Sequence, residues 1–318
     1  MQISNDTLFI APSVFKKVLK LMGNRFEISV VDENAKHADE KIYAAVAEIK
    51  RIETLLTTFS ETSQTNLINR NAGITPVKVD RELFELLVRC NHISRITQGA
   101  FDISYGSADK RFWNFDKDMK SLPDADTAKE QVKLINYRNV ILNEKEQTVF
   151  LKEAGMRIGF GGIGKGYAAQ KAKEVLQQLG VKSGIVNAAG DLTAWGYQPK
   201  GEPWTIGIAD PSAARKAFSY LNITNTSIAT SGNYEKFVMI AGKKYSHTID
   251  PKTGMPVHGI KSVTIIATNP ELADAMATPV MIMGVRAGIH MINQIKETGC
   301  IIIDEDDNIF TSKNINLQ

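Results

Sequence analysis

The sequence has little cysteine, little net charge and no long apolar run, and each shortage excludes a class of protein. Its 318 residues include only 2 cysteines, too few for a disulfide framework or a four-thiolate zinc site. The 38 Lys and Arg residues against 35 Asp and Glu residues give a formal charge of +3, which by itself indicates no nucleic-acid partner. No apolar run reaches the roughly 20 residues of a membrane span, so we expect none.

The N-terminal residues also lack the pattern of a secretory leader. Such a leader places a basic stretch before an apolar run, whereas here Lys16, Lys17 and Lys20 follow the first apolar residues. No early cysteine is present to carry a lipid anchor. We therefore expect a cytoplasmic protein.

The sequence does contain alternating helix and strand patterns. Helices are expected over about 39–59, 80–98, 126–135 and 165–179, with a pair of helices between 270 and 297. Strands are expected at about 28–31, 140–142, 149–151, 156–160, 184–187, 204–208, 227–230, 237–240, 245–249 and 263–267. Neighbouring strands with inserted helices predict an α+β fold with mixed, largely antiparallel sheets and flanking helices. We expect an N-terminal arm over residues 1–20 and one catalytic domain over 21–318.

The densest motif is the glycine cluster Gly159–Gly166. It nearly matches two phosphate-binding devices, the dinucleotide fingerprint and the P-loop. However, Gly166 stands where a P-loop needs Ser or Thr, and the next predicted strand ends without the acidic residue of a dinucleotide site. A tightly packed strand-to-helix turn is therefore an equal alternative. Lys165 falls in the first helical turn, where the helix dipole disfavours a cation, so it should have a phosphate or a carboxylate as partner.

A second motif lies on the helix that begins with the cap Asn269 and Pro270. Asp274 and Thr278 are four residues apart and therefore share one helix face. Their oxygens are of the kind that Mg²⁺ prefers, although both residues could serve only the helix itself. Pro279 should bend or end this helix.

A histidine lies at the end of a predicted strand, where catalytic groups often occur. His247 comes just before the turn Asp250–Gly254, and imidazole is the side chain best suited to proton transfer near neutral pH. From the residues alone, a structural imidazole is the alternative.

Several ordered segments between about residues 22 and 284 together resemble the ApbE family of flavin transferases, which move FMN from FAD to a Thr or Ser of a target protein. The segments are Met22-Gly23, the region 55–60 with Ser63 and 67–69, Gly99–Ile103, Gly161–Ala168, Asn187–Asp191, Ala229–Tyr234, Ser246–Gly254 and Ala273–Thr278. The chain departs from the family pattern at Gly159, Gly164 and Ala189, where the family usually has Asp, Ala and Gly.

The resemblance implies an ApbE-like (T-fold-like) fold with FAD in a cleft between two halves. It implies Mg²⁺, with Mn²⁺ as the alternative, held by the Gly164 carbonyl and the side chains of Asp274 and Thr278. The FAD contacts that it implies are Met22, Phe59, Ala100, Phe101, Asp102, Gly161, Lys165, Tyr167, Ser231, His247 and Ile249. The catalytic residues would be His247, Lys165 and Asp274.

The function expected from the resemblance is Mg²⁺-dependent transfer of FMN from FAD to a Thr or Ser of an acceptor flavoprotein, with release of AMP. Two alternatives stay open. One is an FAD pyrophosphatase that gives FMN and AMP, and the other is a non-catalytic FAD carrier. The presence of both Asp274 and Thr278 argues against the carrier, because a carrier needs no divalent ion.

Overall fold

The computed structural model describes residues 11–109, 111–113, 115, 119–209, 217–233 and 236–315. Its centre is an eight-stranded sheet in which all neighbouring strands are antiparallel. Across the sheet the order is β1 (Ser13–Leu21), β2 (Asn24–Asp32), β6 (Gly184–Ala188), β7 (Asp191–Trp195), β10 (Thr226–Gly232), β13 (Ile260–Ala267), β14 (Thr298–Asp304) and β15 (Ile309–Thr311). The described residues contain no helix that is both long and apolar enough to cross a membrane.

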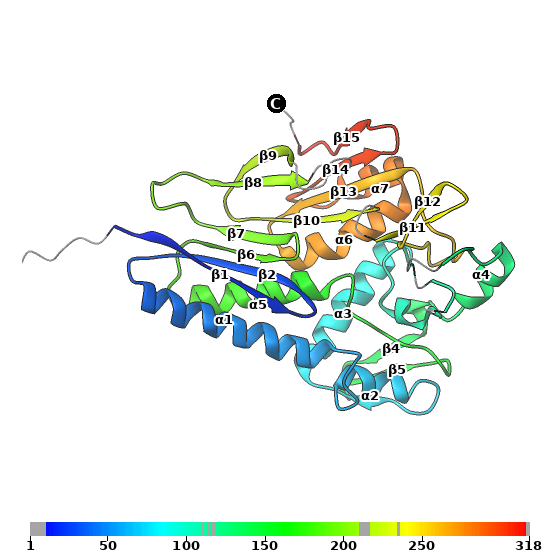
Figure 1. Cartoon of the computed structure of the whole chain (residues 1–318). Coiled ribbons are helices and arrows are strands. Elements are labelled where there is room, and N and C mark those ends of the chain that lie inside the picture. Colours follow the sequence, from blue (N-terminus) through cyan, green and yellow to red (C-terminus); the bar gives the residue numbers. More distant parts are fainter. Residues whose placement is uncertain are drawn as a thin grey trace, which may run out of the picture.

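Helices cover one face of this sheet (Figure 1). They are α1 (Ala35–Leu56), α5 (Gly164–Gln178), α6 (Pro270–Met283) and α7 (Val285–Ile292). In α1 the apolar residues Ile42, Ile49 and Ile52 recur at helical spacing and are fully buried against the sheet side of the molecule. The main hydrophobic core therefore lies between the helices and the sheet.

A hairpin covers part of the other face. It consists of β8 (Trp204–Ala209) and β9 (Ala217–Ile223). Trp204 and Ile223 pack with Leu192, Ala194 and Ile228 of the sheet in a separate buried cluster. Both faces of the central strands are thus buried, which explains why β7 is buried along its whole length.

The remaining elements form a second half beside the sheet (Figure 1). They are α2 (Gln64–Arg70), β3 (Val77–Lys78), α3 (Arg81–Ile96), η1 (Ile103–Ser107), α4 (Ala125–Gln131), η2 (Tyr137–Asn139), β4 (Val140–Asn143), β5 (Thr148–Leu151), β11 (Phe237–Ile240) and β12 (Lys243–Ser246). A small sheet, β3–β5–β4, packs against the main core. A separate buried cluster in this half contains Trp113, Val132, Val238 and Ile249.

The predicted fold class is confirmed, and the predicted helices appear within a few residues of their expected ends. The sequence did not predict α2, β1, β3, β7, β9, β14, β15 or the 3-10 helices η1 and η2. Residues 13–20 of the expected N-terminal arm lie in β1, an edge strand of the sheet. Strand β12 ends at Ser246, earlier than predicted, and α6 continues through Pro279 to Met283.

The prediction of a strand at 156–160 is wrong. The segment belongs to no strand, because its backbone bonds to a side chain and a 3-10 helix. The Asn69 amide accepts from Ile158 N at 2.7 Å and donates to Ile158 O at 3.1 Å, and Gly159 N donates to Ile103 O at 3.0 Å. An apolar pattern cannot distinguish these partners from a neighbouring strand.

Candidate functional site

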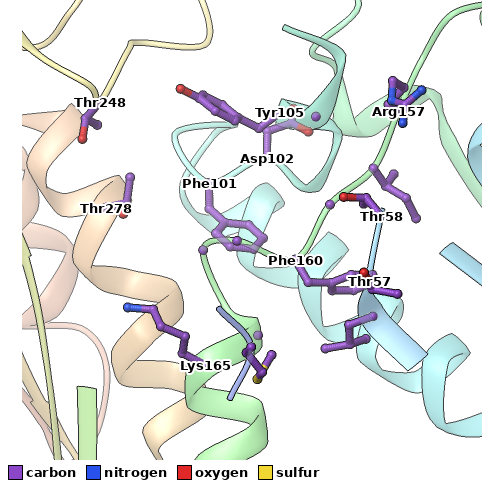
Figure 2. A pocket seen from close by; sticks show the side chains of 18 of the residues that line it. Thr57, Thr58, Phe101, Asp102, Tyr105, Arg157, Phe160, Lys165, Thr248 and Thr278 are labelled. Carbon is purple, nitrogen blue, oxygen red and sulfur yellow. The ribbon is translucent and has the colours of Figure 1, made fainter. Parts of the chain in front are cut away.

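A cavity of about 720 Å³ opens where the two halves meet (Figure 2). Its volume is in the range of small-molecule sites. The wall is formed by the β1–β2 turn, the end of α1, the loop before η1, the glycine turn before α5, the segment after β12 and α6. The residues predicted from the sequence that line it are Met22, Phe59, Ala100, Phe101, Asp102, Gly161, Gly164, Lys165, His247, Ile249 and Thr278.

Three predicted site residues do not line this cavity. Tyr167 points to α3, where its hydroxyl donates to Glu82 Oε1 at 2.6 Å. The Ser231 hydroxyl contacts the Met281 sulfur at 3.9 Å. Asp274 lies behind the glycine turn and is buried, with 6% of its surface exposed. Tyr234, part of the resembling segment Ala229–Tyr234, is outside the described residues.

Met22 reaches the cavity from a two-residue hairpin turn. Leu21 pairs with Asn24, so that Met22 and Gly23 alone connect β1 to β2. Both have positive φ, 50° and 72°, as such tight hairpins require. The Asn24 side-chain amide donates to Met22 O at 2.8 Å and stabilises the turn. The turn therefore presents Met22 at a fixed place on the wall.

The glycine turn has two different reasons for its glycines. A Cβ on Gly161 would meet no atom within 4 Å, and this residue lines the cavity. A Cβ on Gly166 would lie 2.2 Å from Pro270 O and 2.7 Å from Asp274 Cβ, so that only glycine lets α5 approach α6. At the position where a P-loop has Ser or Thr, this chain needs Gly166 for the close packing of α5 against α6. The alternative of a tightly packed strand-to-helix turn therefore holds at Gly166.

Asp274 caps α5 from a neighbouring helix. The N-cap residue of α5 is Ile163, whose side chain has no acceptor. Asp274 Oδ2 instead accepts from Gly166 N at 2.8 Å. Negative charge at a helix N-terminus is favourable, so this contact fixes the first turn of α5 against α6.

Two buried carboxylates interact with the charge of the Lys165 ammonium group. Lys165 forms an ion pair with Asp191, which begins β7 and also accepts from Thr230 N at 3.2 Å. Burial raises the pKa of Asp274 to about 7, the Asp191 charge adds to this shift, and the Lys165 charge opposes it. Burial also raises the pKa of Asp191, against the effect of Lys165. The expected anionic partner of Lys165 is therefore a carboxylate in this structure.

His247 is held by the carbonyl of Lys236. That oxygen lies 3.0 Å from His247 Nδ1 and also 3.0 Å from the His247 backbone nitrogen, which donates to it. Since a carbonyl only accepts, a neutral imidazole keeps its proton on Nδ1 and leaves Nε2 free to act as a base. Burial lowers the pKa of His247, which favours this neutral form.

Asp102 has an internal structural role. Its carboxylate accepts from Ser104 N at 2.8 Å, from Ser104 Oγ at 2.6 Å and from Tyr137 N at 2.8 Å. These bonds fix the loop that places Ala100 and Phe101 on the cavity wall. Burial nevertheless raises the pKa of Asp102.

Arg157 lines the cavity although no motif in the sequence predicted it. Figure 2 shows Lys165 and Thr278 on one side of the cavity and Arg157 and Thr58 on the opposite side. Arg157 flanks the glycine turn, and its guanidinium has no ion-pair partner among the described residues. A single arginine in an extended segment fits no motif, so only the fold places it at the cavity.

Comparisons with known proteins agree with each other. A family model, the ApbE family, matches residues 22–302. A FAD:protein FMN transferase of Klebsiella pneumoniae is 32% identical over 277 residues, which cover 86% of this chain and 85% of the relative. One of Treponema pallidum is 30% identical over 300 residues, 88% of this chain and 83% of the relative.

Solved structures give the same result. The ApbE protein of Thermotoga maritima superposes with a TM-score of 0.85 at 28% identity and covers 95% of this chain and 98% of its own. The flavinyl transferase ApbE of Pseudomonas stutzeri, at 23% identity and a TM-score of 0.82, covers 95% of each chain and supports the fold.

Proposed function

Because the chain belongs to the ApbE family, we propose that it binds FAD in this cavity and transfers the FMN part to a Thr or Ser hydroxyl of an acceptor flavoprotein, releasing AMP. The observation that carries the proposal is that His247, Lys165 and Thr278 all line one cavity, beside the glycine turn. The relatives of comparable length carry the same activity in their names.

The cavity offers separate surfaces for the rings and the diphosphate of FAD. Phe59 is 91% exposed although it is a large apolar side chain, and with Phe101 it lines the cavity. An aromatic ring left in water is well suited to stack on a flavin or adenine ring. The glycine turn lines the cavity beside Lys165, and the Lys165 cation suits the phosphate oxygens.

The residues beside the glycine turn fit a divalent metal ion. Asp274 provides a buried carboxylate, and Thr278 Oγ1 makes no hydrogen bond to any other residue that the structure describes. An acidic group and a diphosphate at one helix N-terminus repel each other, and a bound cation offsets that repulsion. We propose Asp274, Thr278 and the Gly164 carbonyl as the ligands of Mg²⁺. This set has only one carboxylate. It therefore differs from a cluster of three or more His, Cys, Asp or Glu, of which the described residues contain none.

When bound, a divalent ion neutralises charge on the phosphate oxygens during transfer. His247 acts at the acceptor hydroxyl. The hydroxyl oxygen bonds to the FMN-side phosphorus, its proton moves to Nε2 of His247, and the bond from that phosphorus to the bridging oxygen breaks. AMP leaves with this oxygen. The Lys236 carbonyl keeps the second imidazole proton on Nδ1 throughout.

Mass spectrometry of a candidate acceptor tests the proposal. The acceptor is incubated with the chain, FAD and Mg²⁺, and we expect a gain equal to FMN less water on one Thr or Ser, with equimolar AMP. The matched control is His247→Gln, which should leave the acceptor unmodified while FAD still binds. Rapid AMP release without acceptor would instead indicate a pyrophosphatase, and FAD binding without AMP or modified acceptor would indicate a carrier. The cytoplasmic location stays a prediction from the sequence.

A further inference from the structure

The Lys165–Asp191 ion pair lies beside the cavity, and Asp191 is not among the contacts expected with FAD. The Asp191 side chain is 6% exposed and that of Lys165 is 27% exposed. Asp191 does not line the cavity, whereas Lys165 does. A carboxylate this deeply buried is costly unless a cation compensates it.

The fold fixes Asp191 more firmly than it fixes Lys165. Asp191 follows the two-residue turn Ala189-Gly190, whose residues have φ of 57° and 103°, and Ala188 pairs directly with Asp191. The Thr230 amide of the neighbouring strand donates to its Oδ1. Lys165, by contrast, reaches Asp191 with a flexible side chain from the first turn of α5. Asp191 is therefore the anchor of the pair.

Asp274 completes a group of three charges. It interacts electrostatically with both Asp191 and Lys165, although its hydrogen bond is to Gly166 N. Two carboxylates and one ammonium carry a net charge of −1 when all are ionised. One ammonium therefore neutralises only part of the charge of the two buried carboxylates. A divalent cation would compete with that ammonium for the same carboxylates.

We propose that Lys165 is the internal counter-ion of Asp191 and Asp274 in the metal-free protein, and that Asp191 is a positioning residue that holds the Lys165 ammonium beside Asp274. This inference rests on the proposed function, because it takes Asp274 as a metal ligand. With a divalent cation at Asp274, Lys165 is no longer needed to neutralise that carboxylate and can turn to a phosphate oxygen in the cavity that it already lines.

Binding of Mn²⁺ to the full chain, measured by electron paramagnetic resonance without acceptor and with and without FAD, tests this role. Lys165→Met removes the competing cation, and we expect Mn²⁺ to bind at least about tenfold more tightly than to the unaltered chain without FAD. Asp191→Asn removes one negative charge, and we expect several-fold weaker binding. Asp274→Asn removes the ligand and should abolish binding.

The double variant Lys165→Met/Asp191→Asn separates positioning from direct ligation. If Asp191 acts partly through Lys165, Asp191→Asn weakens Mn²⁺ binding more in the Lys165→Met background than alone, because release of the competing ammonium no longer offsets the lost negative charge. Lys165→Met with unchanged or weaker Mn²⁺ binding overturns the counter-ion role. Loss of binding in Asp191→Asn as complete as in Asp274→Asn overturns positioning and makes Asp191 a ligand. Absence of Mn²⁺ binding to the unaltered chain even with FAD would overturn the metal requirement of the proposed function instead.

Discussion

At the scale of single residues, the site depends on how the surrounding protein sets the charge of a few groups. The Lys236 carbonyl orients the imidazole of His247, and burial lowers the pKa of His247, which favours its neutral form. Asp274 is buried, caps a helix and lies near a second acid. These environments give both residues a pH dependence that can be measured.

We expect kcat/KM for FMN transfer to be lost as the pH falls through an apparent pKa below 6.5, the ordinary value for histidine. The sign follows because the neutral imidazole is the base, and burial makes protonation harder. His247→Gln should lower kcat by about 10²- to 10⁴-fold and leave the Kd for FAD nearly unchanged. Initial rates between pH 5 and 8 provide the measurement. Equal loss of FAD binding and of turnover would show that His247 is structural.

Asp274→Asn should change how stability depends on pH. The folded-state pKa of Asp274, about 7, lies above its ordinary 3.8, so its contribution to stability is present below 3.8 and lost as the pH rises through about 7. Asn keeps an acceptor for Gly166 N but carries no charge. The measurement is urea unfolding with a chelator. Between pH 5 and pH 8, we expect the free energy of unfolding of the variant to rise by about 1 kcal/mol or more relative to that of the unaltered chain. A constant difference would contradict a raised pKa.

At the scale of elements, the contact between α5 and α6 places the site. Gly166 lets the two helices approach, and Asp274 then caps α5 while α6 presents Thr278 to the cavity. The segment before the glycine turn is held by Asn69. The geometry of the site therefore depends on packing between elements that are far apart in the sequence.

Gly166→Ala should destabilise the protein by about 1–3 kcal/mol, because the added Cβ would overlap Pro270 O and Asp274 Cβ. It should also weaken metal binding, since α6 must shift. Gly161→Ala is the matched control, because its Cβ meets no atom within 4 Å. Chemical unfolding of both variants measures the difference. Similar stability of the two variants would mean that the close approach of α5 and α6 is not required.

At the scale of the whole molecule, the cavity is shared by both halves. The main core contains residues from β1 to β14, and α1, α3 and the small sheet β3–β5–β4 contribute to it as well. A core that includes both halves predicts one cooperative unit, and the single domain over residues 21–318 stays a prediction.

Calorimetry should therefore show one unfolding transition with equal calorimetric and van't Hoff enthalpies. FAD with Mg²⁺ at 100 times its Kd should stabilise this transition by about 2.7 kcal/mol, since the ligand binds only the folded state. Two separate transitions, or a shift confined to part of the heat absorption, would show that the halves unfold independently.

The sequence by itself determined the fold class, most helices, and the motifs that identify the family. These depend on local periodicity, capping residues and ordered short segments, all of which one chain carries in its order of residues. It also indicated that Lys165 needs an anionic partner, that Asp274 and Thr278 share a helix face, and that His247 ends a strand.

Only the tertiary structure decided which of those residues meet. It paired Lys165 with Asp191, turned Tyr167 toward Glu82, brought Arg157 to the cavity, and replaced a predicted strand at 156–160 by a segment bonded to Asn69. These partners are separated by 26 to 89 residues along the chain. No local pattern encodes contacts over such separations, because they arise from the packing of α5, α6 and the sheet around one core.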